Sequence, residues 1–282
     1  MICLSPISLV DPKGTSNAQR ITVPCGKCLS CLSRRRDDWS FRLKQEVKIC
    51  TSAFFITLTY SDENLPRSDC GLPCVSKRDV QLFMKRLRKS IEPFKIRYFL
   101  VSEYGSKTFR PHYHFILFNL PKSFDVDKII KDAWQKGNID VGTVTAASIH
   151  YVTKYCLSYA ELPKNFERPF MLCSRKPALG SNYLTDNMRE WHNDDLKNYI
   201  VSDGYKQCLP RYYRDRLFSK EQREIISEKT LKMVRANELK LDNKTSKFNN
   251  SRIPFGFSSW TTEKKLDYIR KQKLKLSKDS KL

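Results

Sequence analysis

The sequence has no long apolar run. In its 282 residues no stretch of about 20 consecutive apolar residues occurs, and no segment joins a charged start to an apolar centre. We therefore expect neither a membrane span nor a secretory signal peptide, and predict a soluble intracellular protein. A phosphate-binding loop of the form G-x-x-x-x-G-K-[ST] is also missing, which excludes the commonest nucleotide-binding motif.

Acidic residues are few relative to basic ones. Asp and Glu number 30 against 52 Lys and Arg, which gives a formal net charge of +22. A charge of this sign and size attracts phosphate backbones, so nucleic acid is the first expected partner. An anionic membrane surface is the alternative, and the lack of an apolar run disfavours it. With 40% hydrophobic residues, the chain can still bury a sizeable core.

Cysteine, in contrast, is frequent, with ten residues. Reducing compartments keep thiols free, so a disulfide framework is not expected. Cys25, Cys28 and Cys31 form C-x2-C-x2-C, which can bind Zn²⁺ if another residue completes the site. Candidates for this fourth ligand are Cys3, Cys70 and Cys74. The pattern alone favours reduced, buried thiols over zinc, and an iron–sulfur cluster least.

Strand and helix patterns alternate between residues 54 and 159. Runs of β-branched and aromatic residues predict strands at Phe54–Tyr60, Lys95–Gly105, His112–Phe118 and Ile139–Val144. Apolar residues three and four apart predict helices over 76–91, 126–136 and from 146 to about 159, the first opened by a capping box at Ser76 and Asp79. This order predicts an α+β fold with a central antiparallel sheet and flanking helices.

Two of the four histidines lie in one predicted strand. His112 and His114 are two residues apart, so both rings project from the same face. The tight hairpin brings Glu103 of the preceding strand close, and two imidazoles with one carboxylate suit Mg²⁺ or Mn²⁺ with positions open for a phosphate oxygen. The alternative is a pair of hydrogen-bonded core histidines. Because the same face continues as Ile116 and Phe118, we expect the histidines at the rim of the core.

A second cluster lies in the predicted helix HYVTKYC. Tyr151 and Tyr155 are four residues apart and Lys154 lies between them, so the three side chains occupy neighbouring parts of one helix surface. A tyrosine with a pKa of about 10 needs a nearby cation or proton acceptor before it can attack phosphorus. Lys154 or the metal can supply this help. Aromatic packing beside one surface lysine is the alternative interpretation.

Three segments resemble, in the correct order, the motifs of HUH-superfamily replication initiators: TLTYSDENLP, RPHYHFILF and YVTKY. The flanks VPCGKCLSCLSRRRDDW and LVSEYG are similar to those of initiators of gokushovirus-type microviruses, which are small single-stranded DNA phages. The resemblance covers about Cys25 to Leu184. It implies metal ligands at His112, His114 and Glu103, nucleophiles at Tyr151 and Tyr155, and an electrostatic assistant at Lys154.

The resemblance also implies a function. Family members are metal-dependent, site-specific single-strand DNA endonucleases that form a 5′-phosphotyrosine, release a 3′-hydroxyl primer and rejoin the circle during rolling-circle replication. The implied fold is an RRM/ferredoxin-like palm. The implied partners are single-stranded and origin DNA with a host helicase and DNA polymerase, and no membrane, in the cytoplasm of a bacterial host cell. The alternatives are a relaxase or transposase with the same chemistry, or a non-catalytic basic DNA-binding protein.

Three regions are predicted along the chain. Residues 1–50 form a Cys- and Arg-rich segment that packs on the catalytic domain, 51–185 the HUH endonuclease domain, and 186–282 a basic, partly helical C-terminal region. Basic side chains that can contact DNA phosphates are Arg34, Arg35, Arg36 and Arg110. For the first three, a place at the start of a surface helix is the alternative.

Overall fold

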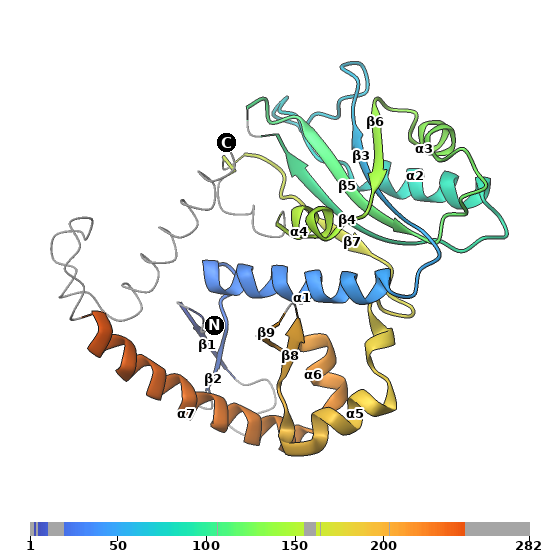
Figure 1. Cartoon of the computed structure of the whole chain (residues 1–282). Coiled ribbons are helices and arrows are strands. Elements are labelled where there is room, and N and C mark those ends of the chain that lie inside the picture. The colour runs from blue at the N-terminus through green and yellow to red at the C-terminus, as the bar shows by residue number, and fades with distance from the viewer. Residues whose placement is uncertain are drawn as a thin grey trace. The chain divides into compact units, whose positions relative to one another are not determined.

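The computed structural model describes residues 3, 5–10, 20–105, 107–154, 162–163, 165–202 and 204–245. Contacts within the chain define two compact units (Figure 1). The sheet unit comprises Arg35–Arg189 and Ser202–Tyr205, and the second unit comprises Met1–Arg34, Glu190–Val201 and Lys206–Leu282. In the described part of the chain, no helix has a stretch long and apolar enough to cross a membrane.

Five antiparallel strands form the sheet of the sheet unit. They are β3 (Ala53–Thr59), β4 (Arg97–Tyr104), β5 (Pro111–Phe118), β6 (Ile139–Thr143) and β7 (Met171–Cys173). Their order across the sheet is β6-β3-β5-β4-β7, and every neighbouring pair is antiparallel. The strand that carries both histidines, β5, is therefore central.

Helices cover both faces of this sheet (Figure 1). On one face, α2 (Lys77–Ser90) and α3 (Val126–Trp134) bury residues such as Phe83 and Trp134 in the larger of two hydrophobic clusters. On the other, α4 (Ala146–Lys154) and the part of α1 (Leu29–Val47) that belongs to this unit contribute Val152 and Leu43 to the smaller cluster. The predicted N-cap is confirmed, because the Ser76 side chain accepts a hydrogen bond from the backbone N–H of Asp79 at 3.2 Å.

A buried carboxylate joins α1 to the sheet. The side chain of Glu46 is 2% exposed and accepts hydrogen bonds from Arg97 Nε at 2.5 Å and Nη2 at 3.2 Å. Its Oε2 also accepts from the backbone N–H of Gly180 at 2.8 Å. An unpaired charge at such a buried position costs about 3–5 kcal/mol, so this contact keeps α1 on β4 and thus covers the apolar part of the histidine face.

A glycine permits the close approach of β6 to the end of β3. Gly137 has φ +153°, and a Cβ at this position would lie 2.4 Å from both the Thr59 carbonyl oxygen and the Ser61 backbone nitrogen. No side chain fits there, because both contacts are with backbone atoms that cannot rotate away. This position therefore fixes the segment that follows Thr59, next to the histidine end of β5.

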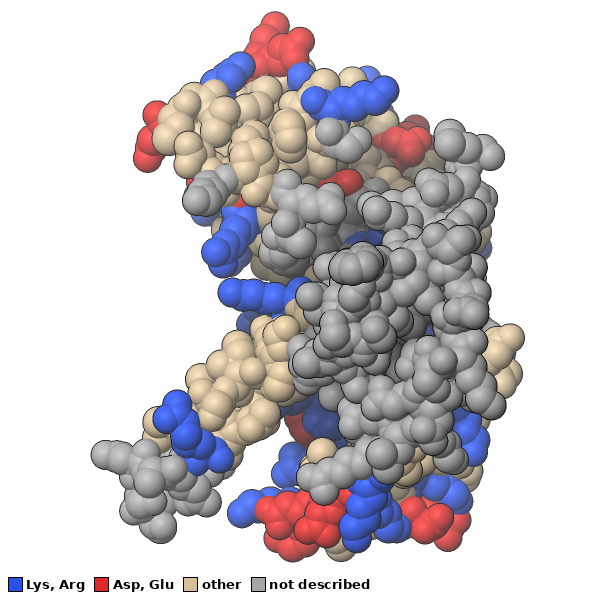
Figure 2. Space-filling view, turned by 90° about the vertical axis from the view of Figure 1, so that its left-hand side faces the viewer, with Lys and Arg blue, Asp and Glu red and all other residues tan. Residues whose placement is uncertain are grey.

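The second unit holds most of the remaining elements. These include β1 (Ile7–Val10), β2 (Arg20–Val23), α6 (Arg211–Leu217) and α7 (Lys220–Thr245), while α5 (Asp186–Asn193), β8 (Tyr199–Ser202) and β9 (Tyr205–Cys208) cross its boundary with the sheet unit. The helical character predicted for residues 217–241 is confirmed by α7. On the described surface, Lys and Arg are spread among Asp and Glu instead of forming one continuous patch in the view of Figure 2.

Candidate functional site

The predicted metal ligands lie on one face of the sheet. Glu103 on β4 is paired in register with His112 on β5, while Thr57 and Thr59 on β3 are paired with His114 and His112. Directly paired residues in an antiparallel sheet project from the same face, so all five side chains share it. Farther along β5 this face is fully buried at Ile116 and Phe118, whereas His112 is half-buried. The predicted rim position is therefore confirmed.

The ring of His112 is oriented by the backbone. Its Nδ1 lies 2.6 Å from the carbonyl oxygen of Arg110, and because a carbonyl only accepts, Nδ1 carries the proton. This hydrogen bond leaves Nε2 as the nitrogen that can bind a cation. Gly105 makes room for the ring, since a Cβ there would lie 3.3 Å from Cε1 of His112.

The more deeply buried His114 has a partner at each ring nitrogen. Nε2 lies 3.0 Å from Glu103 Oε2, and Nδ1 lies 3.2 Å from the Thr57 hydroxyl. Phe55 stacks against the ring with centroids 5.9 Å apart. A hydroxyl can donate or accept, so Thr57 can serve Nδ1 in either tautomer, including the one that frees Nε2 for a cation. Sequence reasoning missed Thr57, although the alternation in TLT places it on the histidine face.

The three residues fit a cation in chemistry but are spread in this arrangement. Two imidazoles and a carboxylate are the right donors, yet the His112 and His114 ring centroids are 6.4 Å apart. Among the described residues, only a group of four cysteines brings three or more ligand atoms within 4.8 Å of one another. A shared cation at the histidines therefore requires His112 and Glu103 to turn inward.

The first predicted nucleophile lies beside this face. In α4, Val152 and Thr153 are buried, whereas Tyr151 is 43% exposed and Lys154 is exposed. The Tyr151 ring meets the His114 ring edge-on, with centroids 5.3 Å apart. The other predicted nucleophile, Tyr155, lies outside the described residues. The structure thus brings Tyr151 to the histidines and places Lys154 on the exposed side of the same helix.

Three other tyrosines of the sheet unit are buried away from solvent. The Tyr60 hydroxyl donates to Asp79 Oδ2 at 2.9 Å, and the Tyr113 hydroxyl accepts from the Ser76 backbone N–H at 2.7 Å. Burial raises the pKa of Tyr104 to about 12, and burial also raises the pKa of both Tyr60 and Tyr113 above the ordinary value. These hydroxyls stay protonated and hydrogen-bonded, so they are poor nucleophiles.

The predicted DNA-contacting arginines have partners within the protein. Arg34, Arg35 and Arg36 lie in α1, where Arg36 forms an ion pair with Asp37 at 2.8 Å. Arg110 donates to Asp62 Oδ1 at 2.6 Å and to the Tyr60 carbonyl oxygen at 2.6 Å. Contact of these arginines with DNA stays a prediction.

The cysteine triplet acquires a fourth member in the second unit. Cys3 joins Cys25, Cys28 and Cys31, and the four side chains lie close enough to hold a metal ion. The other two candidates for this role are outside the group: Cys70 is exposed and Cys74 is buried in the sheet unit.

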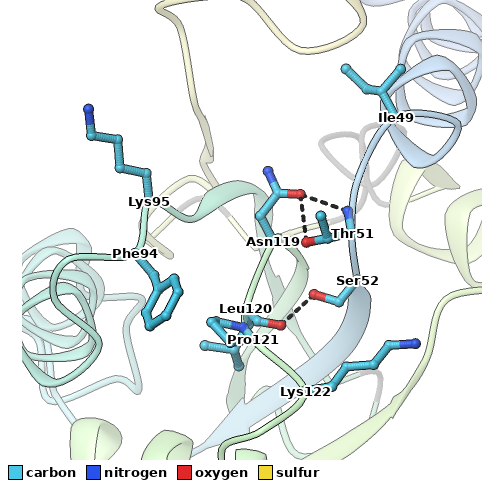
Figure 3. A pocket seen from close by; sticks show the side chains of 9 residues that line it. All are labelled: Ile49, Thr51, Ser52, Phe94, Lys95, Asn119, Leu120, Pro121 and Lys122. Carbon is cyan, nitrogen blue, oxygen red and sulfur yellow. Dashed lines mark hydrogen bonds between the residues drawn. The ribbon is translucent and has the colours of Figure 1, made fainter.

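An open pocket of about 570 Å³ lies at the other end of β5 (Figure 3). The Asn119 side-chain oxygen accepts from the Thr51 backbone N–H at 3.1 Å there, and the Ser52 hydroxyl donates to the Leu120 carbonyl at 2.5 Å. The lining residues are Ile49, Thr51, Ser52, Phe94, Lys95, Asn119, Leu120, Pro121 and Lys122. This lining has neither histidine nor carboxylate, so the pocket does not match the predicted chemistry.

The region from β3 through α4 also matches a known family. The model of a family described as Replication-associated protein ORF2 matches residues 53–159, which include His112, His114, Glu103 and Tyr151. The Replication-associated protein ORF2 of Spiroplasma virus 4 is 30% identical over 243 residues, which cover 74% of this chain and 75% of that protein. The chain belongs to this family of replication-associated proteins.

Two further members of the replication-associated protein family come from phages. The Replication-associated protein VP4 of Bdellovibrio phage phiMH2K is 30% identical over 68% of this chain and 66% of its own length. The Replication-associated protein ORF4 of Chlamydia phage 1 is 27% identical over 80% of this chain and 60% of its own length. No solved structure matches the chain. The resemblance is thus confirmed as one to phage replication-associated proteins, and the narrower superfamily and microvirus assignments stay predictions.

Proposed function

We propose that this replication-associated protein is an HUH endonuclease that initiates rolling-circle replication of a microvirus by nicking single-stranded DNA. The observation that carries the proposal is the edge-on contact of Tyr151 with His114, at 5.3 Å between ring centroids, inside the family match. The order β6-β3-β5-β4, reached through the element order β3-α2-β4-β5-α3-β6, is that of a ferredoxin-like palm and supports it. The high positive charge supports a DNA substrate.

The reaction is a transfer of one phosphodiester. The Tyr151 or Tyr155 hydroxyl oxygen forms a bond to the scissile phosphorus, the bond from phosphorus to the 3′ oxygen breaks, and this oxygen leaves as a 3′ hydroxyl after taking a proton. A Mg²⁺ or Mn²⁺ held by His112, His114 and Glu103 supplies Lewis-acid polarisation of a phosphate oxygen. Lys154 lowers the cost of charge on the tyrosine oxygen.

The second tyrosine allows the circle to be closed. It attacks the junction that replication regenerates, and the 3′ hydroxyl released there attacks the first phosphotyrosine. Each step exchanges one phosphodiester for another, so no ATP is consumed. A host helicase and DNA polymerase, in the cytoplasm of a bacterial cell, complete the proposed system.

The proposal is tested with circular single-stranded DNA that carries the replication origin. Incubation with Mg²⁺ or Mn²⁺, followed by a denaturing gel, should show protein attached to the 5′ end of the cut strand. Cleavage confined to transposon ends or to a transfer origin would favour a transposase or a relaxase. Binding with no cleavage at any metal concentration would favour a non-catalytic DNA-binding protein and refute the proposal.

Replacement of Thr57 by valine should weaken the metal site without removing a ligand. Valine keeps the branched shape but loses the hydroxyl that lies 3.2 Å from His114 Nδ1, so the ring is less well oriented. The concentration of Mn²⁺ that gives half-maximal nicking should rise about 10–100-fold, with activity recovered at high Mn²⁺. Thr59→Val is the matched control, because that hydroxyl donates to the Asn138 carbonyl instead. An unchanged Mn²⁺ dependence in Thr57→Val would show that Thr57 does not position the ring.

A further inference from the structure

The four-cysteine group in the second unit has the dimensions of a mononuclear metal site. The Cys3 and Cys28 sulfur atoms are 3.8 Å apart, those of Cys25 and Cys31 are 4.0 Å apart, and all four lie within 4.8 Å of one another. A zinc–sulfur distance of about 2.3 Å in a regular tetrahedron separates neighbouring sulfur atoms by about 3.8 Å. The cluster therefore needs little contraction to enclose one ion.

Neither a disulfide nor simple burial explains this arrangement. A disulfide requires sulfur atoms about 2.05 Å apart, far less than the distances observed. All four cysteines are only partly buried, so the interpretation that the sequence pattern favoured, reduced thiols hidden in a core, does not account for their convergence. Segments more than 20 residues apart in the chain place sulfur at one point on a partly exposed surface.

Backbone N–H groups point at the sulfur atoms. Lys27 and Cys28 donate to Cys25 Sγ at 3.4 and 3.3 Å, and Cys25 donates to Cys3 Sγ at 3.2 Å. Gly26, with φ +71°, provides the left-handed turn that directs the first two N–H groups inward. Donors of this kind stabilise negative charge on sulfur, as metal-bound thiolates require.

The surrounding chain needs such a tie, because it has little core of its own. Strands β1 and β2 form a two-stranded ribbon, and Ile7, Leu9 and Val10 of β1 are 43%, 48% and 47% exposed. A two-stranded ribbon without a hydrophobic face is marginally stable in water. Cys3 precedes the ribbon and Cys25 follows it, so the cluster closes its base.

We propose that Cys3, Cys25, Cys28 and Cys31 bind one structural Zn²⁺, which ties the base of the β1–β2 ribbon to the first turn of α1. Four thiolates with no position left for water are typical of a structural zinc site, and not of a catalytic one. Cys3 is the fourth ligand. The site lies wholly within the second unit and is independent of the proposed nicking chemistry.

Metal analysis of the full chain tests the proposal directly. Protein produced with zinc in the medium and purified without chelators should contain about one zinc per chain by emission spectroscopy. Iron in its place, or no stoichiometric metal, would overturn the proposal. Removal of zinc from the folded protein by a chelator should expose the region between Cys3 and Cys31 to protease, and unchanged protection would count against a structural role.

The assignment of Cys3 is tested by substitution. Cys3→Ser should raise the dissociation constant for Co²⁺, followed through the visible absorption of tetrahedral cobalt thiolate, by at least about tenfold. Cys70→Ser is the matched control, since this exposed cysteine lies outside the group, and should bind Co²⁺ like the unaltered chain. Equal affinity in Cys3→Ser and Cys70→Ser would show that Cys3 is not a ligand.

Discussion

The double variant His112→Ala/His114→Ala is expected to lose nicking by a factor of about a thousand or more, because loss of Lewis-acid catalysis removes several kcal/mol of transition-state stabilisation. DNA affinity should change little. Most binding energy of a basic protein comes from contacts of Lys and Arg with phosphates, which these substitutions leave in place. Gel-based nicking rates and filter binding at one salt concentration measure the two quantities separately.

Two controls separate metal loss from misfolding. His114 is 5% exposed, so each variant is first checked for cooperative thermal unfolding. His150→Ala replaces an exposed histidine of α4 that is not among the proposed ligands and should retain nicking. Nicking at the original rate by a folded double variant would exclude the histidines as the metal site.

The tyrosine variants are expected to divide the reaction into its two halves. Tyr151→Phe and Tyr155→Phe each remove one hydroxyl, so either single variant should still form a covalent adduct through the remaining tyrosine. Neither should complete cleavage and rejoining of a full circle. The double variant should form no adduct, because it lacks both proposed nucleophiles, which the four-residue spacing predicts about one helical turn, roughly 6 Å, apart. A denaturing gel of labelled DNA measures adduct and closed circle together.

A third tyrosine serves as the control for this experiment. Tyr205→Phe alters a hydroxyl that is highly exposed but belongs to a strand outside the site, and it should preserve both adduct and closed circle. A 5′ protein-linked product from the double variant would place the nucleophile elsewhere. Tyr159, one turn farther along the sequence, would then be the next candidate.

The sequence predicted most of the sheet unit because its periodicities are strong there. From β3 to α4 the predicted order of strands and helices is confirmed, with bounds shifted by one or two residues. The three-residue strand β7 was missed, since so short a segment has no readable alternation and forms only by pairing with β4. The third helix was expected to reach residue 159, and the part after Lys154 lies outside the described residues.

The candidate site was predictable in its residues but not in its geometry. Spacing placed His112 and His114 on one face, and the hairpin placed Glu103 opposite them, as the register now shows. Spacing cannot show that Glu103 contacts His114 rather than His112, or that Thr57 holds the buried ring, because side-chain partners depend on rotamers. Likewise, the chain pattern offered three candidates for the fourth cysteine, and the ribbon β1–β2 selects Cys3.

Burial of Tyr60, Tyr104 and Tyr113 has a consequence for fidelity. Under the proposed chemistry, a phosphodiester captured by any of these side chains would be a dead-end adduct with no partner hydroxyl to resolve it. Their hydroxyls face the hydrogen-bonded interior, and the raised pKa values keep them protonated. The fold thus protects the enzyme from modifying its own core, and limits reaction at these three positions without any need for discrimination by the DNA.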